Sequence, residues 1–135
     1  SIIPNLIVNG IKDAFMVTKA KVLLNVNLMT KHGQTPNYSA ADHVRDLERY
    51  MGRAVDIVVL NNKKISDEVE KYYSEYGEQE VVDDLSDFTD HKIEVLRADL
   101  VADQTVATSM ADVIIRSLQR HDPDKLAKVL SSVIQ

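Results

Sequence analysis

A stretch rich in hydroxyl, amide and basic side chains is the part of this sequence best suited to chemistry. It runs from Thr30 to Val44, directly after an apolar run and directly before a segment with helical periodicity. Open α/β sheets bind their ligands in the turns that follow their strands. Hydroxyl, amide and basic groups can hydrogen-bond phosphate, sugar or base. The sequence therefore predicts a binding loop here, with Thr30, Gly33 and Thr35 among its contacts.

The same loop residues also have ordinary structural uses. Thr30 and Thr35 can close turns through their hydroxyls, and Gly33 can supply a positive φ. A loop that cradles phosphate with its backbone N–H groups needs the same properties. Both interpretations remain open from the sequence.

The helix expected after the loop begins with two further candidates. Ser39 can cap it, with Asp42 three residues on as its capping-box partner. Asp42 is therefore either a binding carboxylate or only a cap. His43 can exchange a proton near neutral pH, although a single histidine is more often structural.

Polar residues also follow each of three predicted strands. Asn27 ends the first, Asn61 and Asn62 follow the second, and Asp99 follows the third. Because parallel strands joined by right-handed crossovers place their carboxyl ends at one edge, these residues are expected to share a crevice. The asparagine pair can alternatively serve only to form a turn.

Two more residues have possible binding roles. Arg120 precedes a helix start at Asp122-Pro123, and its guanidinium can hold a phosphate through two hydrogen bonds. Asp122 is expected to be an ordinary cap. Tyr73 lies on an apolar helical stripe, where it belongs either to the core or to a surface that stacks on a base or sugar.

The elements that must position these residues alternate along the chain. Helices are expected over 5–19, 39–52, 66–77 and 122–134, and strands over 21–27, 55–60 and 92–98, with a short extra strand at 81–82. Residues 113–115 fit either a strand or a helix over 109–118. This alternation predicts an α/β fold, a Rossmann-like three-layer α/β/α arrangement with a mainly parallel sheet.

Composition limits the class of protein. One hundred and thirty-five residues suit a single α/β domain spanning 1–135, and the net charge of −5 argues against non-specific nucleic-acid binding. There is no cysteine, so disulfides and thiolate metal sites are excluded. No run is long enough to span a membrane, and a cytoplasmic location is expected.

Clustered metal ligands and nucleophile–histidine–acid sets are not evident, so no metal site is predicted from the residues. The apolar opening Ser1-Ile2-Ile3-Pro4 has the character of a cut through a structured region. We therefore expect the C-terminal part of a larger domain, whose N-terminal portion is absent. A strand edge exposed in this way could pair two copies as a homodimer.

The quoted motifs resemble the phospholactate transferase and gluconeogenesis-factor superfamily, most closely its bacterial gluconeogenesis-factor branch. The resemblance rests on Asn27 to Thr30 with Gly33, Thr35, Tyr38 and Asp42-His43-Val44, and on the segments at 1–6, 61–62, 98–100 and 120–123. Where that loop often has an acid, this chain has Gln34, and it has gained His32.

This resemblance implies a nucleotide or nucleotide-sugar ligand, and a Gly-rich phosphate-binding turn in an N-terminal half that is absent from this chain. The transferase branch moves a phospholactyl group from a nucleotide-activated donor and uses a divalent metal such as Mg²⁺. The bacterial branch is linked to carbon metabolism, cell-wall formation and cell shape, with no established reaction. Three hypotheses follow: a nucleotide-sugar-binding regulator, a transferase, or a scaffold with a vestigial crevice. The few carboxylates at the crevice, Asp42 and Asp99, favour the first.

Overall fold

The computed structural model describes residues 2–87, 92–103 and 118–133. Contacts within the chain divide it into two compact units. The first comprises Ser1–Val26, Tyr38–Leu60 and Val82–Leu96, and the second comprises Asn27–Asn37, Asn61–Val81 and Arg97–Gln135. The prediction that residues 1–135 form one domain stays a prediction.

A three-stranded parallel sheet confirms the predicted strands and the α/β fold. The order is β1 (Leu23–Asn25), β2 (Ile57–Asn61) and β3 (Glu94–Ala98). β1 and β2 pair in parallel, with Leu24 opposite Val58. Glu94 N–H donates to the Asp56 carbonyl and Asn62 N–H to the Ala98 carbonyl, so β3 runs in the same direction as β2. All three strands therefore end at the same edge.

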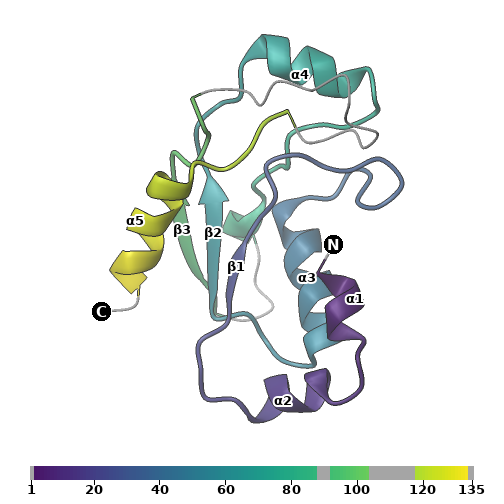
Figure 1. The fold of residues 1–135 in the computed structure, drawn as a ribbon, viewed down its shortest axis with the longest axis vertical. Helices are drawn as coiled ribbons and strands as arrows, with labels where there is room; N and C mark the ends of the chain where they lie inside the picture. Colours follow the sequence, from purple (N-terminus) through teal and green to yellow (C-terminus); the bar gives the residue numbers. More distant parts are fainter. Residues whose placement is uncertain (1, 88–91, 104–117, 134–135) are drawn as a thin grey trace, which may run out of the picture. The chain divides into compact units, whose positions relative to one another are not determined.

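The helix α3 (Ala40–Met51) forms as its sequence predicts (Figure 1). Ser39 and Asp42 make the full capping box, which satisfies backbone N–H groups at the helix start. Ala41, Val44, Leu47 and Met51 make its buried stripe, joined by Ala40. Gly52 ends the helix with φ +77°.

The single helix expected over residues 5–19 was wrong. The structure has α1 (Ile3–Leu6) and α2 (Ile11–Val17), and Gly10, with φ +86°, is the N-cap of α2. A glycine has no Cβ and adopts this left-handed conformation readily, so the chain turns here instead of continuing one helix. Ile7 is 67% exposed, and no residue of α2 is buried.

In the second unit, α4 (Asp67–Ser74) and α5 (Pro123–Val133) begin at their predicted caps. Ser66 accepts a hydrogen bond from Val69 N–H, and Asp122 Oδ1 accepts hydrogen bonds from the next two free N–H groups of α5. A buried cluster of apolar side chains joins α4 to distant segments: Leu28, Met29, Ile65, Val69, Tyr73 and Val101.

The short strand expected at residues 81–82 was also wrong. Its neighbourhood instead holds one antiparallel bridge between Met29 and Glu80, followed by a hydrogen bond from Val81 N–H to the Leu28 carbonyl. Two β-branched residues in sequence indicated a strand, but the pairing does not continue past the bridge. A short 3₁₀ turn, η1 (Leu85–Asp87), follows in the first unit. The alternatives for 113–115 lie outside the described residues.

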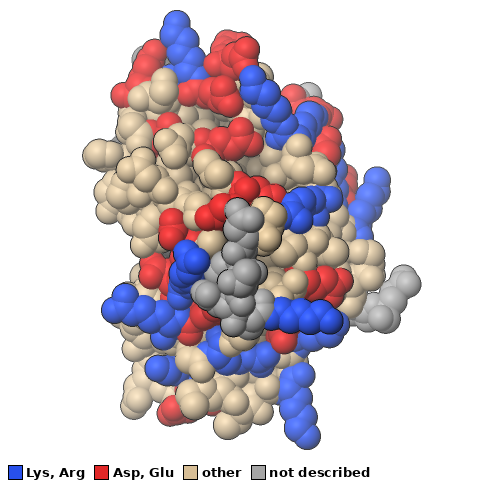
Figure 2. Space-filling model, turned by 180° about the vertical axis from the view of Figure 1, so that it is seen from behind, with Lys and Arg blue, Asp and Glu red and all other residues tan. Residues whose placement is uncertain are grey.

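Two surface properties complete the description. Helices long and apolar enough to cross a membrane are missing from the described part of the chain. Figure 2 shows acidic and basic side chains interspersed on the face it presents, without a broad basic surface of the kind that attracts nucleic acid.

Candidate functional site

The segments that follow the three strands all belong to the second unit, and direct contacts join them. The turn after β2 meets the turn after β3 through Asn62 N–H, which donates to the Ala98 carbonyl at 2.9 Å, and through Leu100 N–H, which donates to Asn61 Oδ1 at 3.1 Å. Met29, from the segment after β1, shares an apolar cluster with Val101. The predicted convergence of the strand ends is therefore present.

The loop after β1 is held in place by its own hydroxyls. Thr30 is 1% exposed, and its N–H donates to the Gln79 carbonyl at 2.8 Å while its Oγ1 accepts from Gln79 N–H at 2.9 Å. Thr35 Oγ1 accepts a hydrogen bond from Lys31 N–H at 2.9 Å, and Thr35 N–H donates to the Lys31 carbonyl. Gly33 lies exposed in this turn with φ +74°. Both hydroxyls therefore fix the loop, leaving backbone groups around Gly33 at the surface.

A buried carboxylate that the sequence did not reveal neutralises the loop's lysine. Glu78 is 6% exposed, and its Oε1 lies 2.8 Å from Lys31 Nζ and accepts a hydrogen bond from His32 N–H at 3.2 Å. The Lys31 ammonium therefore already has an anionic partner. Sequence patterns give no signal for a contact between residues 47 positions apart.

The asparagines at the strand ends have different environments. Asn61 uses its side chain to organise the turn, since Oδ1 accepts from Leu100 N–H and Nδ2 donates to the Lys63 carbonyl at 2.6 Å. Asn27 and Asn62 have exposed side chains. Of these three predicted contacts, Asn27 and Asn62 therefore have the side chains most accessible to a ligand.

Four alternating charges lie at the strand ends, and we call them the charge cluster: Lys63, Asp99, Asp103 and Lys125. Asp99 Oδ2 lies 3.4 Å from Lys63 Nζ and 3.1 Å from Lys125 Nζ. Asp103 Oδ1 lies 3.3 Å from each of the same two ammonium groups. Of the four, sequence analysis identified only Asp99; the helical position of Lys125, near the start of α5, gave no indication of this contact.

The charge cluster shifts the acidity of its members. Hydrogen bonds from Lys63 and then Lys125 hold the pKa of Asp103 below its ordinary value. Desolvation acts to raise the pKa of Asp99, but hydrogen bonds from Lys125, the Val101 N–H and Lys63 outweigh it and lower the pKa. Both carboxylates are therefore held in their charged form by neighbouring cations.

Arg120 and Tyr73 differ sharply in accessibility. Arg120 is exposed, and its carbonyl accepts a hydrogen bond from Ala102 N–H. Tyr73 is 4% exposed within the apolar cluster, and its hydroxyl accepts a hydrogen bond from Gln119 N–H at 3.0 Å. Stacking of Tyr73 on a base or sugar stays a prediction, and this placement gives the ring a core contact instead.

Asp42 and His43 belong to the first unit. Asp42 Oδ2 accepts hydrogen bonds from the Ser39 N–H at 3.0 Å and from its hydroxyl at 3.1 Å, so the carboxylate acts as a cap. His43 Nδ1 lies 2.9 Å from the Ser39 carbonyl. His43 Nε2 is buried without a hydrogen-bond partner in the described part of the chain. Ligand roles for both residues stay predictions.

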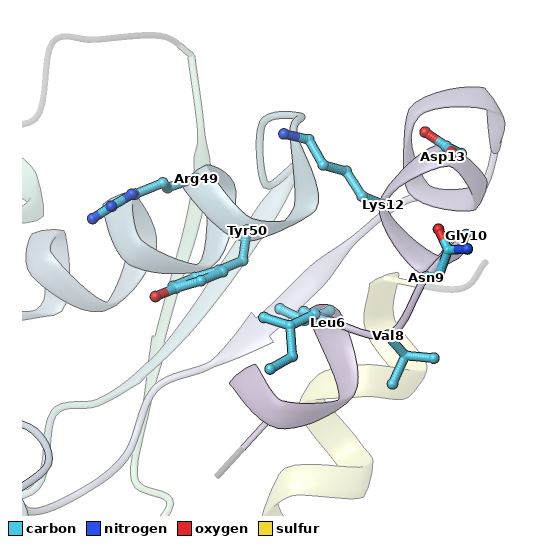
Figure 3. Close-up of a pocket in the computed structure, with 9 residues that line it drawn as sticks. Leu6, Val8, Asn9, Gly10, Lys12, Asp13, Arg49 and Tyr50 are labelled. Carbon is cyan, nitrogen blue, oxygen red and sulfur yellow. The ribbon is translucent and has the colours of Figure 1, made fainter.

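The first unit also contains a hollow of about 370 Å³ between α1, α2 and α3. Figure 3 shows Leu6, Val8 and Asn9 on one side of it and Arg49 and Tyr50 of α3 on the other. None of the predicted site residues lines it. Among residues 2–87, 92–103 and 118–133, groups of three or more acidic, histidine or cysteine side chains placed to hold a metal ion are also missing.

Known proteins resemble this chain in sequence and in fold. It is 37% identical over 133 residues to a Thermotoga maritima protein named "Putative gluconeogenesis factor", and 33% identical over 136 residues to the gluconeogenesis factor of Bacillus subtilis. These matches cover 98% and 100% of the chain but 40% and 39% of the relatives. The chain thus spans about two fifths of their length.

A solved structure is similar to this chain in fold, and it too is longer than this chain. A crystal structure of a UPF0052-family protein from Bacillus halodurans superposes with a TM-score of 0.79 at 25% identity, covering 100% of this chain and 39% of that one. The family model described as 2-phospho-L-lactate transferase CofD matches residues 1–101. These residues include the loop after β1 and all three strands, so the chain belongs to the CofD family.

Proposed function

We propose that this protein is a nucleotide-sugar-binding regulator of the gluconeogenesis-factor type, with a role in carbon metabolism and in cell-wall and cell-shape control. The observation that supports this most directly is the joining of three polar turns at the carboxyl ends of parallel strands. Such an edge is where open α/β sheets receive nucleotides. The relatives named gluconeogenesis factor supply the cellular context.

The sugar and phosphate parts of a nucleotide sugar have matching groups in the second unit. The amides of Asn27 and Asn62 can exchange hydrogen bonds with sugar hydroxyls, and the N–H of the exposed Gly33 can meet an anionic oxygen. Arg120 offers a planar guanidinium that can hold phosphate through two hydrogen bonds. Thr30, Thr35 and Asn61 act indirectly in this proposal, since their side chains hold the turns in place.

A phospholactate-type transferase is the second candidate, favoured by the description of the matching family. Moving a phosphorus-containing group needs a divalent ion such as Mg²⁺, or equivalent positive charge, at the reacting oxygens. Asp99 is the predicted carboxylate at the strand ends of the second unit, but two lysines already contact it. The local chemistry therefore favours binding over transfer.

Calorimetric titration of the full-length protein with UDP-, GDP- and ADP-linked sugars, with and without Mg²⁺, separates the three hypotheses. Saturable heat without a new product supports the regulator, whereas Mg²⁺-dependent product supports the transferase. If none of these ligands binds, the scaffold hypothesis is the one that remains.

A matched pair of variants tests the site itself. Arg120→Ala should weaken binding about ten-fold or more, the size expected for loss of a charge-assisted phosphate contact. Arg49→Ala removes another exposed arginine, from α3, and should leave binding unchanged. Equal affinity of the Arg120→Ala variant and the wild type would remove Arg120 from the site.

A further inference from the structure

The charge cluster at the strand ends contains one carboxylate that is fixed and one that is not. Asp99 Oδ1 accepts a hydrogen bond from Val101 N–H at 3.2 Å, which ties this side chain to its own turn. The Asp103 side chain is 74% exposed, and within the described part of the chain a single carboxylate oxygen contacts the two lysines. Asp103 can therefore leave the cluster without breaking a backbone contact.

The two lysines are held more firmly than Asp103. Lys125 Nζ donates to the Val101 carbonyl at 2.8 Å as well as to both carboxylates. Lys63 leaves a turn organised by the Asn61 side chain. Since the carbonyl and Asp99 contacts remain when Asp103 moves, the two ammonium groups stay close together.

The position of Lys125 also goes against the usual electrostatics of a helix. It is the third residue of α5, near the positive end of the helix, where a cation is disfavoured. Asp122 Oδ1 already occupies the N–H groups of Asp124 and Lys125, so this end has few backbone donors left for an anion. Anion binding here would depend on the lysine side chains.

We propose that Lys63 and Lys125 form a binding site for a phosphate or diphosphate group, and that the Asp103 carboxylate occupies this site until the ligand displaces it. The inference deepens the proposed function, on which it rests, by assigning the place of the ligand's phosphates. With Asp103 displaced, two ammonium groups and Asp99 carry a net charge of about +1. A diphosphate carries about −2 and several acceptor oxygens, so it attracts the two ammonium groups more strongly than a single carboxylate of −1 does.

The test measures binding of two probes, inorganic pyrophosphate and the nucleotide sugars, to the full-length protein at low salt. Asp103→Asn removes the competing anion and should tighten the binding of both probes by about three- to ten-fold, an effect that added salt reduces. Lys63→Gln and Lys125→Gln should each weaken it by about as much. Lys63→Gln keeps the test informative if loss of the Lys125 contacts with Asp99 and the Val101 carbonyl prevents folding.

Asp67→Asn is the matched control, because it removes the same charge from the exposed Lys64–Asp67 pair in the same unit. It should leave both affinities unchanged. Equal tightening by Asp103→Asn and Asp67→Asn, or none by Asp103→Asn, would overturn the two-lysine site. Nucleotide-sugar binding unaffected by any of these variants would refute this site while leaving the proposed function intact. Suppose that pyrophosphate binding is tightened by Asp103→Asn and weakened by both lysine variants, but that nucleotide sugars do not bind. This result would support the site and refute the proposed function.

Discussion

The two units of the molecule differ in the side chains that they bury. In the first, β2 and α3 supply buried apolar side chains, such as Val58, Val59 and Val44, each 0% exposed. In the second, an apolar cluster is accompanied by buried polar residues that are hydrogen-bonded to distant segments, such as Thr30 with Gln79 and Gln119 with Tyr73. Burial of apolar surface favours any compact arrangement, whereas a buried polar group is stable only with its own partner.

This difference agrees with our proposal that the second unit binds the ligand. Polar links fix the geometry of the turns after the strands, where a ligand would have to be met by correctly aimed groups. Most residues of the three strands belong to the first unit. We therefore expect mutations in the first unit to change stability most, and mutations of the polar links to affect the turns most directly.

The largest effect is expected from Met51→Ala. Met51 is 1% exposed on the buried stripe of α3, so truncation removes apolar contacts and leaves a cavity. The free energy of unfolding should fall by about 2–5 kcal/mol. Urea denaturation followed by circular dichroism measures this change. Met16→Ala is the control, because Met16 is 58% exposed and its loss should cost far less.

A smaller but more local effect is expected from Thr30→Val. The substitution keeps the shape of the side chain but removes the hydroxyl that accepts from Gln79 N–H, leaving this N–H without that partner. The cost should be about 1–3 kcal/mol. Hydrogen exchange of the Gln79 amide should accelerate more than that of amides in β2. Uniform acceleration across both units would mean that Thr30 does not act locally, and the contrast between the units would fail.

The same contrast explains what the sequence could predict. The capping box at Ser39 and the parallel direction of the strands follow from local spacing and apolar periodicity, and both were predicted correctly. The pairings of Lys31 with Glu78 and of Lys63 with Asp103 join residues far apart in the chain. Local patterns do not encode such pairings, which depend on the completed fold.

The errors have the same origin. One helix was expected over residues 5–19. Whether a glycine such as Gly10 only lowers helix stability or adopts a positive φ depends on the surrounding contacts. At 81–82, β-branched residues fitted a strand, but a strand also needs a neighbour along its whole length. For the candidate site, residue types identified the turns, while the roles of Thr30 and Asn61 in holding them became visible only with their partners.

The smallest expected effect is a change in the pH dependence of stability, caused by Glu80 in the second unit. Burial, followed by repulsion from Glu70, raises the pKa of Glu80 above its ordinary 4.5. A carboxyl whose pKa is raised on folding binds its proton more tightly in the native state, so stability falls as pH rises through the interval above 4.5. Glu80→Gln removes this cost and should raise the melting temperature slightly at pH 7.

This advantage should disappear below about pH 4, where Glu80 is protonated in both states. Thermal melts of the wild type and the variant between pH 3.5 and 7 test the interval directly. Because Glu70 contributes to the shift, Glu70→Gln should reduce the gain obtained from Glu80→Gln. A gain that stays constant across this pH range would show that the amide acts through packing instead of charge. In that case the region of the Met29–Glu80 bridge would depend on packing, as the first unit does, and the contrast between the two units would not hold there.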